Sequence, residues 1–102
     1  MYKLKITEAA FDDLDAIYKY IDEQLLEPVI AQNITDEIEK QIRSLTDFPH
    51  RCALSRNELL AKKGYRILVV KNYVAPYLVN ESPKQVIVAR VFHGSMDYEK
   101  YI

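Results

Sequence analysis

Two arginines lie within apolar stretches of the sequence, where a charged side chain is unusual. Arg66 is the second residue of the segment YRILVV, and Arg90 is the third residue of VARVF. A guanidinium group in such a place either pairs with a carboxylate or points to the open side of a sheet. If Arg66 and Arg90 share an open sheet face, their planar groups can grip a phosphate through paired hydrogen bonds. The alternative is a salt bridge from each arginine to Glu58, to Glu81 or to a helix acid.

Two further side chains near the C-terminus could move protons. His93 precedes Gly94, and the glycine permits a turn that would place the imidazole at the end of a sheet. Tyr98 lies in the segment that follows. Together with Arg66 and Arg90, these groups could support metal-free cleavage of RNA, in which the RNA's own 2′-hydroxyl attacks the phosphate. The alternative for His93 is a turn histidine that bonds only to the backbone.

Aromatic and basic residues in the second half of the chain suit unpaired nucleic acid. Tyr73 and Tyr77 share one face of an expected strand, and tyrosine rings can stack on bases. Arg56, Lys62 and Lys63 could steer a phosphate backbone. The alternatives are half-buried packing for the tyrosines and solvated loop charges for the lysines.

The charge is distributed unevenly between the two halves of this 102-residue chain. Residues 1–47 hold five Lys or Arg and eleven Asp or Glu, whereas residues 48–102 hold nine and four. The basic second half favours an anionic partner, such as nucleic acid. The alternative is that acidic helices face solvent and that basic strands pair with them.

The composition limits the other classes of protein. The single cysteine, Cys52, cannot form an internal disulfide and has no metal-ligand spacing around it. The chain has no glycine-rich phosphate loop and no nucleophile elbow, so we expect neither a metal nor a cofactor. Its longest apolar run is four residues, whereas a membrane-spanning helix needs roughly twenty. The N-terminus reaches acidic residues too early for a secretory signal, so we expect a cytoplasmic protein that binds no membrane.

Two amphipathic helices are expected in the first half of the chain. Thr7 is a suitable N-cap for a helix from Glu8 to Leu25, and Pro28 can begin a second helix that ends near Asp47. Apolar residues recur at helical spacing in both segments: Phe11, Leu14, Tyr18, Ile21 and Leu25, then Ile30, Ile34, Ile38, Ile42 and Leu45. The short joint between the helices predicts a helical hairpin whose two apolar stripes face one core.

Strands are expected on both sides of this hairpin in the sequence. They cover residues 2–6, 65–70, 73–79 and 85–92, with turns at 71–72 and 80–84. The last strand is the most apolar, so we expect it to be central. Pro76 cannot donate a hydrogen bond to a neighbouring strand, so we expect its strand at an edge of the sheet or bulged.

The order of these elements predicts an α+β fold: an N-terminal strand, a helical hairpin and a three-strand antiparallel meander, with the helices packed on one sheet face. The other face is then free of helices and could hold a binding site. Residues 48–64 show no clean periodicity, and residues 95–102 form either a short helix or a tail.

At this level the sequence resembles the RelE/ParE superfamily of toxins from bacterial type II toxin–antitoxin systems. The resemblance covers nearly the whole chain and treats residues 1–102 as a single domain. It is carried by the order of the elements and by five short motifs: FP after the second helix, GYRILV, NE at the turn, RVFHG and then DY.

The resemblance implies a growth-inhibiting toxin, of the kind that stabilises plasmids, held inactive by a cognate antitoxin. RelE-like members are ribosome-dependent mRNA endonucleases; Arg66 matches their strand arginine at the scissile phosphate, and His93 and Tyr98 fall near their C-terminal catalytic positions. ParE-like members poison DNA gyrase and are not nucleases. Ser95 and Met96 stand where many relatives carry arginines. An mRNA interferase, a gyrase inhibitor and a non-toxic antitoxin-binding module are the three hypotheses.

Overall fold

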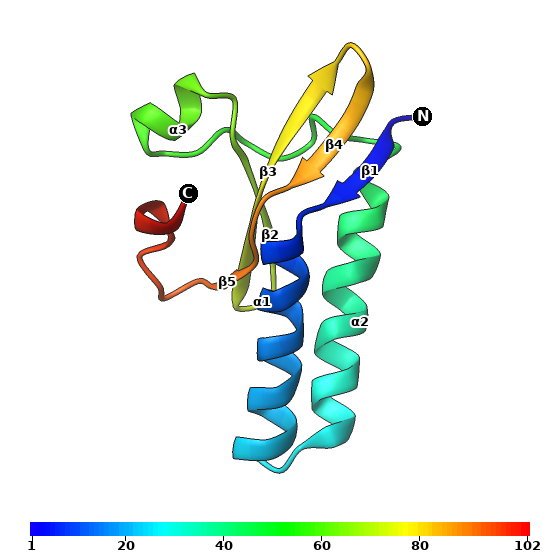
Figure 1. Cartoon of the computed structure of the whole chain (residues 1–102), viewed down its shortest axis with the longest axis vertical. Helices are drawn as coiled ribbons and strands as arrows, with labels where there is room; N and C mark the ends of the chain where they lie inside the picture. The colour runs from blue at the N-terminus through cyan, green and yellow to red at the C-terminus, as the bar shows by residue number, and fades with distance from the viewer.

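The computed structural model describes all 102 residues and consists of a helical hairpin beside a five-stranded sheet (Figure 1). The hairpin projects beyond one end of the sheet, and the C-terminus lies on the far side of the sheet from the N-terminus. None of the helices combines the length and the apolar character needed to cross a bilayer. The elements are β1 (Lys3–Ile6), α1 (Glu8–Lys19), a π-helical turn (Tyr20–Gln24), α2 (Pro28–Ser44), α3 (Glu58–Lys62), β2 (Arg66–Val70), β3 (Tyr73–Glu81), β4 (Lys84–Val88), β5 (Phe92–His93) and a 3-10 turn (Tyr98–Tyr101).

Helix α1 begins at the expected cap. The Thr7 hydroxyl accepts a hydrogen bond from the backbone N–H of Ala10 at 3.1 Å and donates one to the carbonyl of Ala89 at 2.7 Å. The helix ends earlier than expected, because its last turn widens into the π-helical turn. Within the expected apolar stripe, Leu14 and Ile21 are buried, whereas Phe11 and Leu25 are exposed.

Helix α2 begins at Pro28, as expected, and ends at Ser44, three residues before the expected end. The C-terminal part of its apolar stripe is fully buried, at Ile38, Ile42 and Leu45. The N-terminal part is not, because Ile30 lies where the hairpin extends past the sheet. The hairpin is therefore packed on the sheet at one end and open at the other.

The sheet has the strand order β1-β4-β3-β2, with β1 parallel to β4 and the other neighbours antiparallel. This confirms the meander and the central position of the strand that begins near Gln85. Beyond β2, residues 53–55 extend the sheet through a bridge from Leu54 to Arg66. Strand β5 returns to pair with the start of β3.

Pro76 does not lie in an edge strand, but the ladder bulges opposite it, which was the second of the two expected situations: three residues, 89–91, face two residues of β3, 75–76, between the paired positions. Pro76 lies in β3, between β2 and β4, where it is fully buried and pairs with Ile67. The Pro76 carbonyl accepts a hydrogen bond from the N–H of Ala89. In an antiparallel pair the N–H and the carbonyl of one residue point to the same neighbouring strand, so the missing N–H of Pro76 also faces the segment of Ala89. Strand β4 ends at Val88, one residue before that point. The proline is tolerated because its partner strand leaves the ladder there.

One face of the sheet and the helical hairpin form the core. Its members come from both helices and from β2, β3 and β4: Ala10, Leu14, Ile38, Ile42, Leu45, Leu68, Val70, Ala75, Tyr77, Val86, Val88 and Val91. The helices therefore cover one sheet face, as expected. The region 48–64, for which no element was expected, contains α3, capped by the Asn57 side chain on the N–H groups of Leu59 and Leu60.

The opposite sheet face is not bare. Pro76, which points away from the helices, is fully buried, and the backbone at Gly64 approaches the Leu78 side chain. Gly64 has φ of 92°, which favours glycine and confirms the expected turn before β2. The segment around α3 and the C-terminal turn lie on the left of the sheet in Figure 1 and flank this face.

Candidate functional site

Arg66 points to the helix-covered side of the sheet rather than to the open side. It pairs in register with Tyr77, and paired residues project to the same face. Its Nη1 donates to the carbonyl oxygen of Cys52 at 2.6 Å and to that of His50 at 3.4 Å. Arg66 therefore holds the loop that follows α2 against β2.

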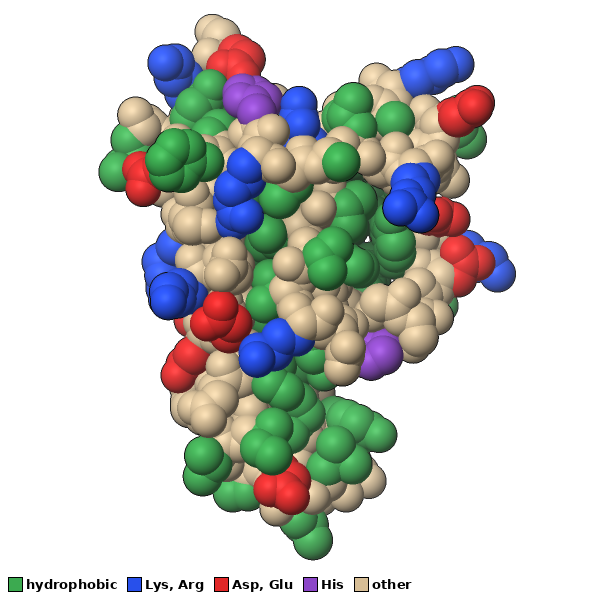
Figure 2. Space-filling model, turned by 180° about the vertical axis from the view of Figure 1, so that it is seen from behind, with side chains coloured by type: hydrophobic (Ala, Val, Ile, Leu, Met, Phe, Trp, Pro, Cys, Tyr) green, Lys and Arg blue, Asp and Glu red, His purple; other side chains and the backbone are tan.

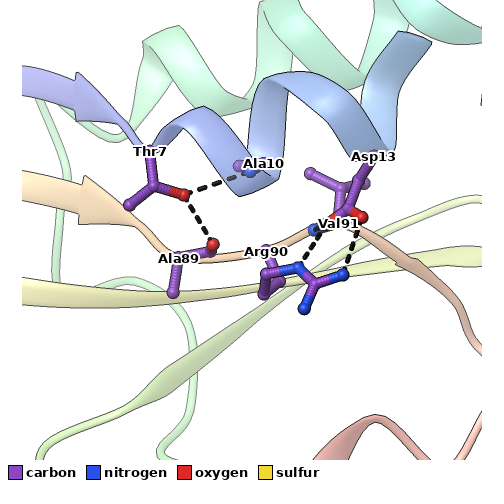
Figure 3. A network of polar contacts seen from close by, with 6 residues as sticks. All are labelled: Thr7, Ala10, Asp13, Ala89, Arg90 and Val91. Carbon is purple, nitrogen blue, oxygen red and sulfur yellow. Dashed lines mark hydrogen bonds and ion pairs between the residues drawn. The ribbon is translucent and has the colours of Figure 1, made fainter. Parts of the chain in front are cut away.

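Arg90 lies in the break between β4 and β5 and is engaged by an acid of α1 (Figure 3). Its Nε and Nη2 donate to the two carboxylate oxygens of Asp13 at 2.7 and 2.9 Å. The Asp13 carboxylate also accepts the backbone N–H of Val91 at 2.9 Å. These contacts raise the pKa of Arg90, chiefly through the hydrogen bonds to Asp13. The guanidinium carbon lies 4.6 Å from the centre of the Phe92 ring.

The expected phosphate clamp is therefore not formed by Arg66 and Arg90. Neither guanidinium group is free: that of Arg66 donates to loop carbonyls, and that of Arg90 donates to a carboxylate. The salt-bridge alternative holds for Arg90, with Asp13 as its partner. The prediction of an open sheet face with two free arginines was therefore wrong. Arg66 pairs in register with the core residue Tyr77, and Arg90 is held by the carboxylate of Asp13.

Tyr77 is also unavailable to a nucleic acid, so its expected role in base stacking was wrong. The side chain is fully buried, and its hydroxyl donates to the carbonyl of Pro49 at 2.7 Å. Burial holds the pKa of Tyr77 well above the ordinary range of a phenol. Tyr77 is a packing residue that fastens the same loop as Arg66.

Two of the expected site residues do lie together. Arg56 and Tyr98 line a groove of about 330 Å³, whose other walls come from β2, from the segment before it and from the C-terminal turn: Ala53, Leu54, Ile67, Val69 and Glu99. The Tyr98 ring stacks on Phe92, with the ring centres 6.3 Å apart. This groove combines one cation, one acid, one half-buried aromatic ring and an apolar floor.

His93 lies in a different place, in a pocket of about 420 Å³ with Ala16, Ile17, Tyr20 and Tyr73. Its ring meets Tyr73 edge-on, with centres 5.5 Å apart. Its Nδ1 accepts the backbone N–H of Ser95 at 3.1 Å, as in the turn-histidine alternative, and it also lies 2.6 Å from the Ser95 hydroxyl oxygen, so His93 is not bonded to the backbone alone. Burial, with Tyr20 nearby, raises the pKa of Tyr73.

The remaining expected residues are separate from both cavities. Lys62 and Lys63 lie at the C-terminal end of α3, exposed and without an ion pair. His50 contacts the carboxylate of Glu81 at 2.9 Å, and the Tyr2 hydroxyl donates to the same carboxylate at 2.6 Å. The hydrogen bond from Tyr2 lowers the pKa of Glu81, with His50 contributing.

The candidate catalytic groups do not share one cavity: Tyr98 lines the groove and His93 the pocket, whereas Arg66 and Arg90 line neither and are held by Cys52 and Asp13. Cleavage of RNA would need an acid, a base and cations around a single phosphate. Neither cavity brings such a set together.

Sequence analysis missed one exposed feature, at the open end of the helical hairpin. Tyr20, Leu25, Leu26, Val29 and Ile30 are all exposed there. A signal was present, because Leu25-Leu26 and Val29-Ile30 are adjacent apolar pairs and neighbouring helical residues cannot both face one core. Asp13 was also missed, since nothing local distinguishes it from its acidic neighbours.

Comparison with known proteins identifies the family to which the chain is similar. Residues 4–98 match the family model described as the ParE toxin of the type II toxin–antitoxin system parDE. A chain from the chromosomal ParDE toxin–antitoxin system of P. aeruginosa is 28% identical, with a TM-score of 0.75 over 91% of this chain and 96% of that chain. A chain from the RelBE toxin–antitoxin complex of Mycobacterium tuberculosis is 24% identical, with a TM-score of 0.59 over 90% of this chain and 96% of that chain. No curated protein matches the sequence.

Proposed function

The chain belongs to the ParE toxin family and is the toxin of a type II toxin–antitoxin system, and on this premise we propose that it arrests growth by binding DNA gyrase rather than by cleaving RNA. Its physiological partner in the resting state is a cognate antitoxin, as in the toxin–antitoxin complexes to which it is similar.

The observation that carries this proposal is the pairing of Arg90 with Asp13. A metal-free nuclease needs free cations at the phosphate, and both strand arginines of this chain already serve its own loops and helix. A protein that acts by binding needs no such group, only a surface that fits its target.

The second candidate function is mRNA cleavage on the ribosome. The groove with Arg56 and Tyr98 favours it, because an unpaired base can stack on a half-buried tyrosine beside a cation. Arg66 would have to leave its loop carbonyls to reach a phosphate. We therefore rank this function below gyrase binding.

The test combines one assay in vitro with one in cells. Purified chain is added to DNA gyrase and relaxed plasmid, and supercoiling is followed on gels; the antitoxin complex is the matched control. We expect inhibition by free toxin and none by the complex. In cells, induced toxin should produce DNA breaks without new transcript ends. Transcript cleavage with normal supercoiling would identify the nuclease, and unaffected growth would identify an inert antitoxin-binding module.

A further inference from the structure

Strand β2 lies at an edge of the sheet, and its outer side is only partly covered. Residues 53–55 lie along its first half, where the N–H of Ile67 donates to the carbonyl of Ala53 at 3.1 Å. Because the backbone groups of a strand point to alternate sides, the next N–H and carbonyl on this side are those of Val69. No strand of the chain pairs with Val69 there, so both groups are free to bond to a partner.

This edge lacks the protection that natural sheets give to an exposed edge strand. Charged side chains, above all lysines, usually keep other strands from pairing with an edge. The opposite edge strand, β1, carries Lys3 and Lys5, which are both exposed. In β2 the four residues 67–70 are Ile, Leu, Val and Val. An uncovered edge of this composition attracts other strands, so we expect a partner to cover it while the toxin is held inactive.

The apolar groove beside Tyr98 runs along the same edge. Its walls include Ile67 and Val69, the two side chains of β2 that alternate with buried core residues and so point away from the helices. Val69 is 66% exposed, and Leu54, which also lines the groove, is 47% exposed. On the right of Figure 2, where α3 and the C-terminal turn lie, hydrophobic side chains surround a hollow with a Lys or Arg side chain at its edge. A strand paired with Val69 would place every second side chain over this groove.

The cations near this edge are not neutralised within the chain. Arg56 lines the groove, and Lys62 and Lys63 lie just before β2. None of the three forms an ion pair, and Glu99 is the one acid that lines the groove. Like charges therefore oppose the pairing of two copies of this chain through β2, whereas an acidic segment would meet free cations.

We propose that the outer side of β2 binds the cognate antitoxin, and that an extended, apolar and acidic segment of the antitoxin adds as a strand beside Val69. Main-chain hydrogen bonds supply affinity in such an arrangement, and the side chains over the groove supply specificity. The antitoxin fits this edge because it is the partner of the inactive toxin, whereas a target that meets only free toxin would leave the edge bare until then. The inference rests on the part of the proposed function that gives the chain an antitoxin, and it does not depend on gyrase as the target.

The first test follows the exchange of the Val69 amide hydrogen by NMR, in the free chain and in the complex with the full-length cognate antitoxin. In the free chain Val69 should exchange faster than Leu68 and Val70, whose N–H groups point to β3. In the complex we expect the exchange of Val69 to be at least about tenfold slower than in the free chain. This measurement needs no substitution, so it decides the inference even where a variant fails to fold.

The second test changes the edge itself. Val69→Pro removes the outward N–H, and proline is tolerated where that group faces away from an edge strand. Val69→Thr is the matched control, because it keeps the N–H and the β-branched shape. Arg56→Glu reverses one charge in the groove, and Lys5→Glu makes the same change on the opposite edge strand. Thermal melting, antitoxin affinity and inhibition of gyrase supercoiling are measured for each variant.

We expect Val69→Pro to bind the antitoxin at least about tenfold more weakly than the wild type, and Arg56→Glu at least about threefold more weakly. The two controls should stay within about twofold. Wild-type affinity of a folded Val69→Pro, or unchanged exchange of Val69 in the complex, would overturn the inference. Weaker binding by Lys5→Glu alone would move the antitoxin to β1, and protection of Val69 that grows with the concentration of free chain would assign the edge to a second copy; either result would overturn it. Antitoxin bound at Val69 without gyrase inhibition by the free toxin would overturn only the gyrase proposal, whereas gyrase inhibition without antitoxin binding would overturn only this inference.

Discussion

The Asp13 carboxylate binds the guanidinium of Arg90 through both of its oxygens, across 77 residues of sequence. The same carboxylate accepts a hydrogen bond from the backbone N–H of Val91. It therefore supplies a hydrogen-bond acceptor to the segment between β4 and β5, beside Pro76. Thr7 adds a second link from the start of α1 to Ala89 in the same break (Figure 3). The break in the sheet is thereby fastened to helix α1, and this contact, rather than phosphate binding, explains Arg90.

Removal of the carboxylate should destabilise the fold. In Asp13→Ala, Arg90 and the Val91 N–H lose a charge-assisted partner in a half-buried place. We expect the free energy of unfolding to fall by about 2 kcal/mol and the melting temperature by roughly 10 °C. Urea and thermal unfolding measure this. Asp12→Ala, on the exposed face of the same helix turn, is the control and should change little. A fully stable Asp13→Ala would show that the pairing contributes nothing.

Replacement of Arg66 separates the two candidate functions. Arg66 fastens the loop at Cys52, so Arg66→Ala should speed hydrogen exchange in residues 50–53. Under gyrase binding, growth arrest persists in Arg66→Ala. Arg66→Lys serves as the companion variant, because a lysine can keep one bond to the Cys52 carbonyl without the planar fork of arginine. Loss of growth arrest in both variants, with unchanged melting and exchange, would favour phosphate chemistry instead.

Much of the fold could be predicted because its signals are local. Thr7 and Pro28 mark helix starts by backbone chemistry, and Gly64 marks a turn by its freedom of φ. Helical spacing of apolar residues located the hairpin, although Phe11 and Leu25 of the first stripe are exposed and α1 gives way to a π-helical turn at Tyr20. A change of pitch within a helix leaves no mark in a periodic pattern.

The candidate site could not be predicted to the same extent, because its partners are distant in sequence. Nothing near Arg90 indicates Asp13, and nothing near Tyr77 indicates Pro49. Pro76 was expected at an edge or at a bulge because its missing N–H is evident from the residue itself. Which of the two holds depends on where the neighbouring strand β4 ends, at Val88, and the residues around Pro76 do not indicate that. Strand alternation places Tyr77 on one of two faces but does not say which face the helices cover.

Gly64 allows a further test of the turn before β2. With φ of 92°, a side chain at this position is strained even though an added Cβ would have room. Gly64→Ala should lower the free energy of unfolding by about 1–2 kcal/mol. Gly64→Asn should cost less, because asparagine tolerates positive φ better than alanine. Chemical denaturation of the three proteins gives the comparison, and equal stability of all three would contradict the strained turn.

The Tyr77 hydroxyl yields a prediction that depends on pH. Tyr77→Phe removes the donor to Pro49 and leaves that buried carbonyl unpaired, so the free energy of unfolding at neutral pH should fall by about 1 kcal/mol. Urea unfolding, fitted with a common slope, measures the difference. Tyr98→Phe is the control, because the Tyr98 hydroxyl makes no hydrogen bond within the chain.

The sign of the pH effect follows from the raised pKa of Tyr77. In the unfolded chain a tyrosine loses its proton near pH 10, whereas in the fold burial keeps the proton on Tyr77 to higher pH. Above about pH 10 the folded state therefore binds more protons than the unfolded state, and the wild type loses stability as pH rises. Tyr77→Phe has no hydroxyl to titrate at this position, so it does not lose this contribution to stability. The difference in the free energy of unfolding between the wild type and Tyr77→Phe should therefore narrow from pH 9 to about pH 11. A constant gap for Tyr77→Phe would mean that the hydroxyl titrates normally and is not enclosed by the fold.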